Sequence, residues 1–185
     1  MQMQVKTQPA QAGVTMSWEQ RFVETVIKRC NNDKGLAARL RRADNPATEY
    51  QSWEVLGALG VDLEKEYQRL PFVTVAAAIA KSKVEHNGNL KLGRAIAACY
   101  VDGNQSDQAK ARMRRLLACG ELAEVCRILR SVLTLIDSKV GQPLDFVLLL
   151  KQLRNFHFNG QRIKTQWAQE FYGQPAQAEN GEAKA

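Results

Sequence analysis

Residues 107–138 contain two consecutive amphipathic stretches, 107-DQAKARMRRLLA-118 and 121-ELAEVCRILRSVLTLIDS-138, separated by Gly120. The apolar residues of the first stretch recur at the three- and four-residue spacing of one helix face: Ala109, Met113, Leu116 and Leu117. Ser106 lies directly before this stretch and is a typical helix N-cap. The first turn of the second stretch carries two acids, which suit the positive end of a helix dipole. Both stretches are therefore predicted to be helices.

The same reasoning extends outward along the chain. Further helices are predicted from Ser17 to Asn32, from Asp33 to Arg42, after Asn45-Pro46 up to Gly57, from Asp62 to Tyr67, and over 71–84, 90–100, 144–157 and 161–172. We expect Leu70-Pro71 to break the chain between two of them, and Asn159-Gly160 to form a turn before the last. The alanine run in 71–84 favours a helix over a strand in spite of its valines. The predicted fold is all-α, a compact multi-helix bundle.

The chain has 185 residues, enough for one domain or two small lobes. Residues 17–172 are predicted to form a single helical domain, within which 17–86 and 90–172 could be two packed lobes. Residues 1–16 are rich in Gln, and residues 173–185 consist largely of Gly, Ala, Gln and Glu. Neither segment has an apolar periodicity, so both are expected to be disordered tails.

Charge is unevenly distributed along the chain. The formal net charge is +7, but residues 17–42 carry +4, residues 43–80 carry −4 and residues 81–119 carry +5. One interpretation is a basic face for phosphates together with a separate acidic face for a protein neighbour. The alternative is that these charges are ordinary solvated side chains.

The sequence offers little support for catalysis or metal binding. The two histidines, His86 and His157, are far apart; His157 lies between two phenylalanines and is predicted to be packed, whereas His86 lies in an Asn/Gly-rich loop. The four cysteines form no Cys-x-x-Cys pair, so we expect small buried residues of a reducing compartment and no metal site. We find no phosphate-binding glycine loop, signal peptide or membrane-spanning run. The prediction is a cytoplasmic protein that is not an enzyme, has no cofactor and does not contact a membrane.

A basic helical chain without catalytic groups is predicted to bind nucleic acid, because the arginine side chain matches phosphate oxygens. The candidate residues are Arg41, Arg42, Arg94, Arg112, Arg114, Arg115, Arg162 and Lys164. Arg41 and Arg42 end a short predicted helix and run into a loop, although they could simply balance the helix dipole.

The other candidates have their own reasons. At least two of the three arginines in 112–115 must be exposed, and Gly93 would let a backbone approach closely beside Arg94. Arg162 and Lys164 begin the last predicted helix, where positive charge does not stabilise the dipole. Four aromatic residues could stack on bases, but their helical spacing places them in the core first: Trp53, Trp167, Phe171 and Tyr172. Binding is therefore expected to be to the nucleic-acid backbone.

Four short motifs, in this order, give the chain a resemblance to a known family. They are 38-ARLRR-42 followed by an acidic residue, 92-LGRA-95, 112-RMRRLL-117, and the closing stretch made of 156-FHFNGQRIK-164 and 167-WAQEFY-172. Over residues 17–172 the chain resembles the CasB family, the small subunit of the type I-E CRISPR surveillance complex (Cascade). The Gln-rich N-terminal segment has no counterpart in that resemblance.

The resemblance implies an all-helical, non-catalytic subunit of an antiviral, RNA-guided complex. It implies a homodimer within the complex that contacts the backbone subunits and the large subunit. It also implies contacts with the guide RNA, the target DNA and the displaced strand of the R-loop. Carried over to this chain, the basic positions of the matching motifs are the eight candidate residues, although some of Arg112, Arg114 and Arg115 could be structural.

Two other functions are compatible with the sequence. One is a helical regulator that reads a DNA sequence, with residues 107–118 as its recognition helix and Gln108, Arg112 and Arg115 on the exposed face. The other is a helical adaptor that binds only protein, docking through the acidic segment 43–80. Strong discrimination between cognate and random duplexes would support the regulator, and no binding of nucleic acid at low salt would support the adaptor.

Overall fold

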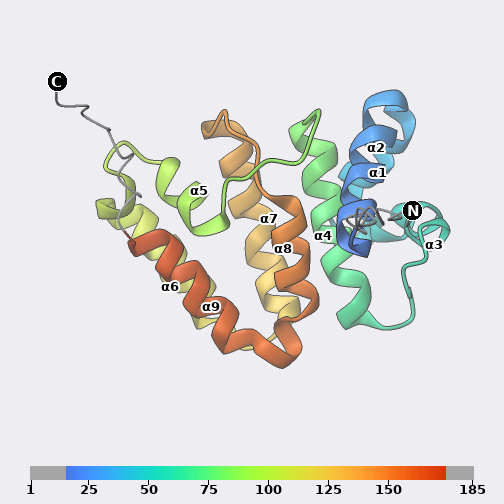
Figure 1. Cartoon of the computed structure of the whole chain (residues 1–185). Helices are drawn as coiled ribbons and strands as arrows, with labels where there is room; N and C mark the ends of the chain where they lie inside the picture. The colour runs from blue at the N-terminus through green and yellow to red at the C-terminus, as the bar shows by residue number, and fades with distance from the viewer. Residues whose placement is uncertain (1–15, 174–185) are drawn as a thin grey trace, which may run out of the picture.

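The buried helix α4 (Glu66–Ser82) lies between helices that come from both ends of the chain. The computed structural model describes residues 16–173. On one side of α4 lie α1 (Trp18–Asn32) and α2 (Lys34–Arg42), and on the other lie α7 (Leu122–Lys139) and α8 (Phe146–Arg154), as Figure 1 shows. Most of α4 from Leu70 to Ala80 is buried, as expected for a helix that is apolar on all sides.

Three helices pack on the far side of α7 and α8: α5 (Leu92–Ala98), α6 (Asp107–Ala118) and α9 (Phe156–Tyr172) (Figure 1). A short 3-10 helix, η2 (Gly103–Gln105), joins α5 to α6. The backbones of α5 and α9 approach so closely that a Cβ atom on Gly93 would lie 2.7 Å from the amide nitrogen of Phe171 and closer still to the carbonyl oxygen of Trp167. The close approach predicted beside Arg94 is thus made by the backbone of α9 itself.

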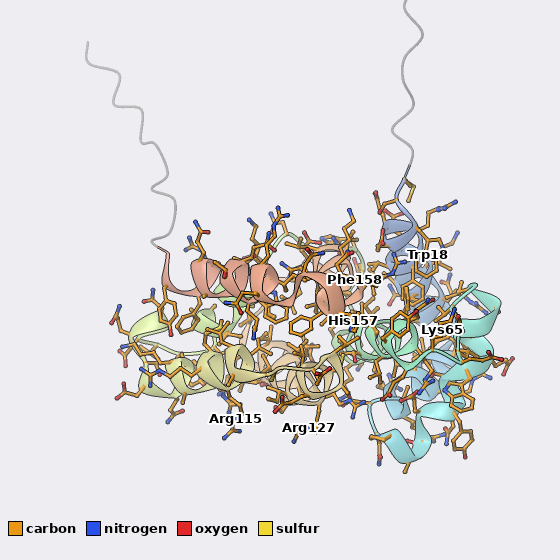
Figure 2. All side chains as sticks on the ribbon, turned by 90° about the horizontal axis from the view of Figure 1, so that it is seen from below. Trp18, Lys65, Arg115, Arg127, His157 and Phe158 are labelled. Carbon is orange, nitrogen blue, oxygen red and sulfur yellow. The ribbon has the colours of Figure 1, made fainter. Side chains whose placement is uncertain are left out.

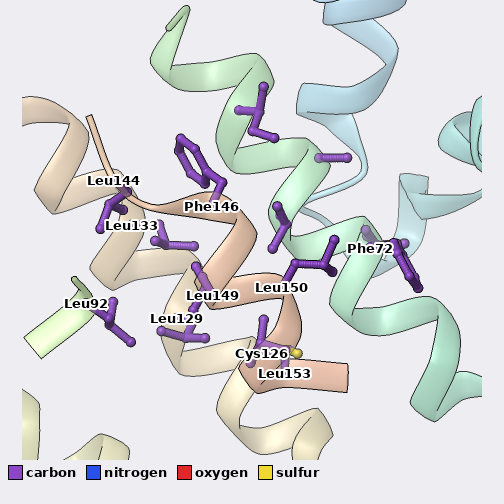
Figure 3. Close-up of a cluster of buried hydrophobic side chains, with 14 of the residues drawn as sticks. Phe72, Leu92, Cys126, Leu129, Leu133, Leu144, Phe146, Leu149, Leu150 and Leu153 are labelled. Carbon is purple, nitrogen blue, oxygen red and sulfur yellow. The ribbon is translucent and has the colours of Figure 1, made fainter. Parts of the chain in front are cut away.

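One continuous apolar core joins the two sides of the molecule. Figure 3 shows its central part, where Leu129 and Leu133 of α7 lie near Leu149 and Leu150 of α8. Phe72 lies on the other side of α4, where its ring contacts Trp18 and Phe22 of α1. Trp167 of α9 is fully buried, and its indole Nε1 donates a hydrogen bond of 2.7 Å to Oε1 of the buried Gln152. This pair lets the core include a polar side chain without an unsatisfied donor.

The all-α prediction is confirmed for the described residues, which contain helices and a single isolated bridge between Leu90 and Leu144. The predicted helix starts are confirmed at the level of the capping atoms. Ser17 Oγ accepts from the amide of Gln20 at 3.2 Å, and Asp33 Oδ1 accepts from the amide of Leu36 at 2.9 Å. Ser106 caps α6 in the same way.

The predicted break at Leu70-Pro71 is wrong, because α4 runs from Glu66 through Pro71 without interruption. Pro71 lies early in the helix, so its missing N–H removes only the hydrogen bond to the carbonyl of Tyr67. Its side chain is buried among the other apolar residues of α4, which offsets that loss.

The helix predicted after Asn45-Pro46 is divided into a 3-10 helix, η1 (Pro46–Ser52), and α3 (Trp53–Ala58). Two hydroxyls of η1 bond to main-chain carbonyls: Thr48 donates to Arg42 at 2.5 Å and Ser52 donates to Glu49 at 2.7 Å. Side-chain bonds of this kind compete with regular helical hydrogen bonding, and they favour the tighter turn.

The last helical segment is interrupted where a turn was predicted. α9 spans Phe156–Tyr172, but Asn159 has a non-helical conformation with φ −129° and ψ 24°, so a short segment from Phe156 precedes this kink and the main part of the helix follows it. The turn predicted at Asn159-Gly160 is present as the kink, and Arg162 lies in the first turn after it. Lys164 lies beyond that turn, so the argument from the helix dipole applies to Arg162 alone.

The predicted disordered tails, 1–16 and 173–185, lie outside the described residues except for Met16 and Gly173. Within the described part, α4 contacts α7 and α8 across the predicted boundary between lobes 17–86 and 90–172. The division into two lobes stays a prediction.

Candidate nucleic-acid interface

Ion pairs within residues 16–173 set seven basic residues apart from the candidate cations. The cations that form ion pairs are Arg39, Lys65, Arg69, Lys81, Arg127, Arg130 and Arg154. None of these belongs to the eight predicted residues. For the seven candidates other than Arg94, no carboxylate of the described residues lies within 4.0 Å of the charged group.

α6 exposes two of its three candidate arginines. Arg114 and Arg115 are exposed and form no side-chain hydrogen bond within the described part of the chain, while Met113 and Leu116 on either side of the pair are buried. The expectation that at least two of the three must be exposed is confirmed. Arg112 is half-buried, and its Nε donates to the hydroxyl of Tyr100 at 2.5 Å, so this arginine ties α6 to the end of α5.

Lys164 brings α9 to the C-terminal end of α6. Its half-buried ammonium group donates to the carbonyl of Cys119 at 3.0 Å, one turn after Arg115. Burial raises the pKa of the Cys119 thiol, and the cations Arg127 and Lys164 act in the opposite direction. Figure 2 shows Arg115 and Arg127 on the same edge of the molecule. We call Arg114, Arg115, Arg127 and Lys164 the α6–α7 edge.

Arg94 and Arg162 belong to a different surface, along a groove between α5, α8 and α9. Arg94, Gln152, Gln166 and Glu170 line this groove. Arg162 is exposed on α9, one helical turn before Gln166, and makes no side-chain hydrogen bond or ion pair with another described residue. The structure therefore separates Arg162 from Lys164, which lie on opposite sides of α9.

Glu170 lies in the same groove. Its Oε2 accepts from the amide of Gly93 at 3.1 Å, which fixes α9 against the start of α5. Burial raises the pKa of Glu170, while the Gly93 amide and the charges of Lys91 and Arg94 counteract part of that rise. This acid opposes an anionic ligand at its end of the groove, so the Arg162 end is the more favourable one.

Arg41 and Arg42, at the end of α2, donate hydrogen bonds to other groups of the protein. Arg41 is half-buried and donates to the carbonyl of Ala80 in the last turn of α4 at 3.3 Å. Arg42 is exposed and donates to Oε1 of Gln51 at 3.3 Å. The structure thus places this pair in the N-terminal half, away from the residues of α6 and α9.

The acidic segment 43–80 supplies carboxylates to cations of the chain itself. Glu49 is buried and accepts from Arg69 Nε at 2.6 Å, and Glu54 accepts from Arg39 at 2.7 Å. Asp44 accepts from Lys81, and its Oδ1 lies 3.7 Å from Nε of Arg130. The segment is therefore only in part the separate acidic face that its net charge suggested.

Of the four aromatic residues predicted to lie in the core, the structure buries two and exposes two. Trp167 and Phe171 are buried, as predicted, but Trp53 is 42% exposed and Tyr172 is 47% exposed. The prediction that His157 is packed is wrong as well, because the kinked start of α9 leaves His157 and Phe158 at the surface. The neighbouring Phe156 is the member of this motif that enters the core.

The cysteines are free thiols, and within residues 16–173 no group of His, Cys, Asp or Glu has the geometry of a metal site. Cys119 and Cys126 are buried as expected, whereas Cys30 and Cys99 are half-buried. Burial raises the pKa of Cys126 and of Cys30 to about 11 in each case. In the described region, no helix is both long enough and apolar enough to cross a membrane.

A charge pattern that sequence reasoning missed lies in α8 and α9. From Phe146 to Gln169 the chain carries four basic residues, one of which is Lys164, and no carboxylate. Among these basic residues, Lys151 and Arg162 are exposed without an ion pair within the described residues, while Arg154 is paired with Glu19. Counting acids along this stretch of sequence would have identified it and would have added Lys151 to the candidates.

Comparison with solved structures shows which class of protein has this fold. M. ruber CasB matches with a TM-score of 0.67 and 25% identity over 85% of this chain and 94% of that protein. A CRISPR-associated protein of the Cse2 family from Thermus thermophilus matches with a TM-score of 0.70 and 23% identity over 86% and 100%. A chain of a CRISPR RNA-guided surveillance complex matches with a TM-score of 0.64 and 22% identity over 83% and 90%. The fold is that of small helical CRISPR-associated proteins.

The family follows from the sequence itself. Residues 36–172 match the family model described as CRISPR-associated protein Cse2. The chain belongs to this Cse2 family, and the resemblance drawn from its four motifs is confirmed. A search of curated protein sequences finds no match.

Proposed function

We propose that this chain is a non-catalytic subunit of a type I-E CRISPR RNA-guided surveillance complex that holds nucleic acid by its backbone. Its role is to stabilise the guide RNA–target DNA duplex and the displaced strand during antiviral defence. Membership of the Cse2 family and the match to a surveillance-complex chain support the assignment to such a complex. The observation that carries the binding role is that the predicted cations, Arg94 apart, lie outside the ion pairs of residues 16–173.

The proposed mechanism is electrostatic. Exchanging a DNA duplex for a guide–target duplex is nearly balanced in base-pairing energy, so modest protein contacts can decide the outcome. Arg114 and Arg115 of the α6–α7 edge and Arg162 on α9 are exposed and need no change within the fold to reach phosphates. Contacts of this kind carry no sequence preference, which is what a displaced strand of arbitrary sequence requires.

The proposed partners are the guide RNA, the target DNA with its displaced strand, the backbone and large subunits of the complex, and a second copy of this chain. The proposed location is the cytoplasm. The sequence-reading regulator is less well supported, because Arg112 is engaged by Tyr100 and one of its three predicted reading residues is therefore occupied.

Purification from the native cell tests the assignment to a complex. A tagged chain is expected to co-purify with CRISPR RNA and with the other subunits. Recovery of the chain without RNA and without those subunits would contradict it.

The binding role is tested in the assembled complex with Arg114→Ala/Arg115→Ala and with Arg41→Ala/Arg42→Ala. Each pair that contacts the backbone is expected to weaken binding of target DNA and to increase cleavage of the displaced strand by a single-strand nuclease. Unchanged target affinity and unchanged salt dependence would remove that pair from the interface. If both pairs behave in this way, the backbone-binding role itself is contradicted.

A further inference from the structure

Three aromatic rings form a ladder on the surface where α4 begins and α9 begins. The ring of Tyr67 lies 6.1 Å from that of His157 with an interplanar angle of 30°, and the ring of His157 lies 5.0 Å from that of Phe158 with an angle of 84°. Phe158 is 76% exposed, Tyr67 is 45% exposed, and His157 is exposed as well. Exposed apolar side chains that are contiguous and rimmed by polar residues are typical of a binding surface.

Figure 2 looks directly onto this surface. His157 and Phe158 lie side by side at the start of α9, with Lys65 towards the α4 side. Tyr67 connects the two elements, because it belongs to the first turn of α4 and contacts His157. The ladder therefore spans two helices that are far apart in the sequence, and both helices are anchored in the core by buried neighbours, Leu70 and Phe156.

The charges around the ladder favour an anionic partner at its α9 end. The stretch 146–169 that contains His157 and Phe158 has no carboxylate, and Arg162 is exposed four residues after Phe158, just beyond the kink at Asn159. At the other end, Glu64 and Glu66 flank Lys65 and Tyr67, so the positive potential is greatest towards Arg162. A polyanion that also carries flat apolar groups matches this combination of rings and cations.

We propose that Tyr67, His157 and Phe158 are a stacking platform for the bases of single-stranded nucleic acid, with Arg162 holding a phosphate beside it. The inference rests on the proposed function, but it adds contacts to bases where that function requires contacts only to the backbone. Stacking on aromatic rings tolerates any base, because every base has a π-face. The platform would therefore strengthen binding of an unpaired strand without reading its sequence.

The same platform distinguishes an unpaired strand from a duplex. In a duplex the faces of the bases are covered by their neighbours, so rings at a protein surface cannot stack on them without unstacking the helix. The phosphate contacts of the α6–α7 edge are available to either form. The ladder is thus the part of the surface that selects single strands.

The test uses the full chain and two labelled strands of equal length, an oligothymidylate and an abasic strand with the same phosphates and no bases. Fluorescence anisotropy at low salt gives the affinity for each. The wild type is expected to prefer the thymidylate strand, and Phe158→Ala is expected to reduce that preference about five-fold or more. Phe158→Trp should keep the preference for the thymidylate strand, because it keeps an aromatic ring at this position. Arg162→Ala should weaken binding of both strands.

Two controls keep the result interpretable. Tyr50→Ala removes a 59% exposed aromatic side chain of η1, outside the ladder, and should leave the preference unchanged. Because Phe158 is exposed, Phe158→Ala should unfold at the wild-type temperature. A strand containing 5-iodouracil should crosslink to one of the three ladder residues on irradiation.

Equal affinity of the wild type for both strands, or a preference that survives Phe158→Ala, overturns the platform. If the arginine variants still weaken binding in that case, the proposed function stands and this inference alone fails. If the wild type binds neither strand at low salt, both fail. If Phe158→Ala blocks incorporation into the complex and leaves strand binding unchanged, the ladder belongs to a protein contact and the inference is overturned.

Discussion

The two halves of this chain use their basic residues differently. In the N-terminal half, acids of the segment 43–80 pair with basic residues of the chain, as in Glu49–Arg69 and Asp44–Lys81. In the C-terminal half, Arg127, Arg130 and Arg154 are paired as well. Residues 146–169 nevertheless contain no carboxylate, and Arg114, Arg115 and Arg162 stay exposed without an ion pair to another described residue. The comparison teaches that the place where acids are missing locates a candidate interface better than the place where bases are most dense.

The largest effect is expected from removing an internal ion pair of the N-terminal half. Glu49→Ala leaves Arg69, whose side chain is 19% exposed, without its carboxylate partner. We expect a loss of about 3 kcal/mol in the free energy of unfolding, measured by urea titration. Glu54→Ala removes the 79% exposed partner of Arg39 and should cost about 0.5 kcal/mol. Equal effects of the two variants would break the contrast between buried and exposed pairs.

The C-terminal half should depend on close packing between helices. Gly93→Ala would place a Cβ atom 2.7 Å from the amide nitrogen of Phe171 and closer still to the carbonyl oxygen of Trp167. Separating α5 from α9 to relieve these contacts should cost about 2 kcal/mol of stability. Gly120→Ala, where the added Cβ has no neighbour within 4 Å, is the matched control. A Gly93 variant as stable as this control would show that the approach of α5 and α9 is looser than described.

For the affinity for nucleic acid, substitutions in the C-terminal half should have a larger effect than substitutions in the N-terminal half. Arg114→Ala/Arg115→Ala is expected to weaken binding of a single strand about ten-fold at low salt, with stability within about 0.5 kcal/mol of the wild type. Arg41→Ala/Arg42→Ala should weaken it less, because both side chains already donate within the fold. Native gel shifts measure the first quantity and thermal unfolding the second. A larger loss of affinity from Arg41→Ala/Arg42→Ala than from Arg114→Ala/Arg115→Ala would contradict this expectation.

The smallest effect concerns pH and Glu170. Burial raises the pKa of this carboxyl in the folded protein, so on raising the pH the unfolded chain loses its proton first. Stability contributed by the protonated form is therefore full below the unfolded pKa and is lost as the pH rises through the folded pKa. Glu170→Gln keeps an acceptor for the Gly93 amide and should not show this loss. Urea midpoints at pH 4 and pH 7 test the difference, and parallel changes in both proteins would contradict it.

The sequence predicted most helices and their caps because those signals are local. Ser17, Asp33 and Ser106 each bond the amide three residues later, and that geometry depends only on residues within one turn. Pro71 was misread because the packing of α4 overrides this local helix breaker within a buried helix. The interruption predicted at Asn159-Gly160 is present as the kink in α9.

The site was predictable in residue type and only partly in position. The helical pattern around Met113 and Leu116 was sufficient to place Arg114 and Arg115 at the surface. No local pattern could show that Arg112 reaches Tyr100 or that Lys164 reaches Cys119, because these contacts join different helices. Exposure of Phe158 was hidden for the same reason, since it depends on where α9 begins.

The central claim, that exposed arginines of the C-terminal half bind phosphates, is tested most directly by the salt dependence of single-strand binding. The affinity of the full chain is measured from about 50 to 200 mM salt for the wild type and for Arg114→Ala/Arg115→Ala/Arg162→Ala. The account predicts that the slope of log K against log salt becomes shallower by about 0.7 for each lost phosphate contact, about 2 in total. A variant with the same slope as the wild type would show that these side chains do not contact the strand.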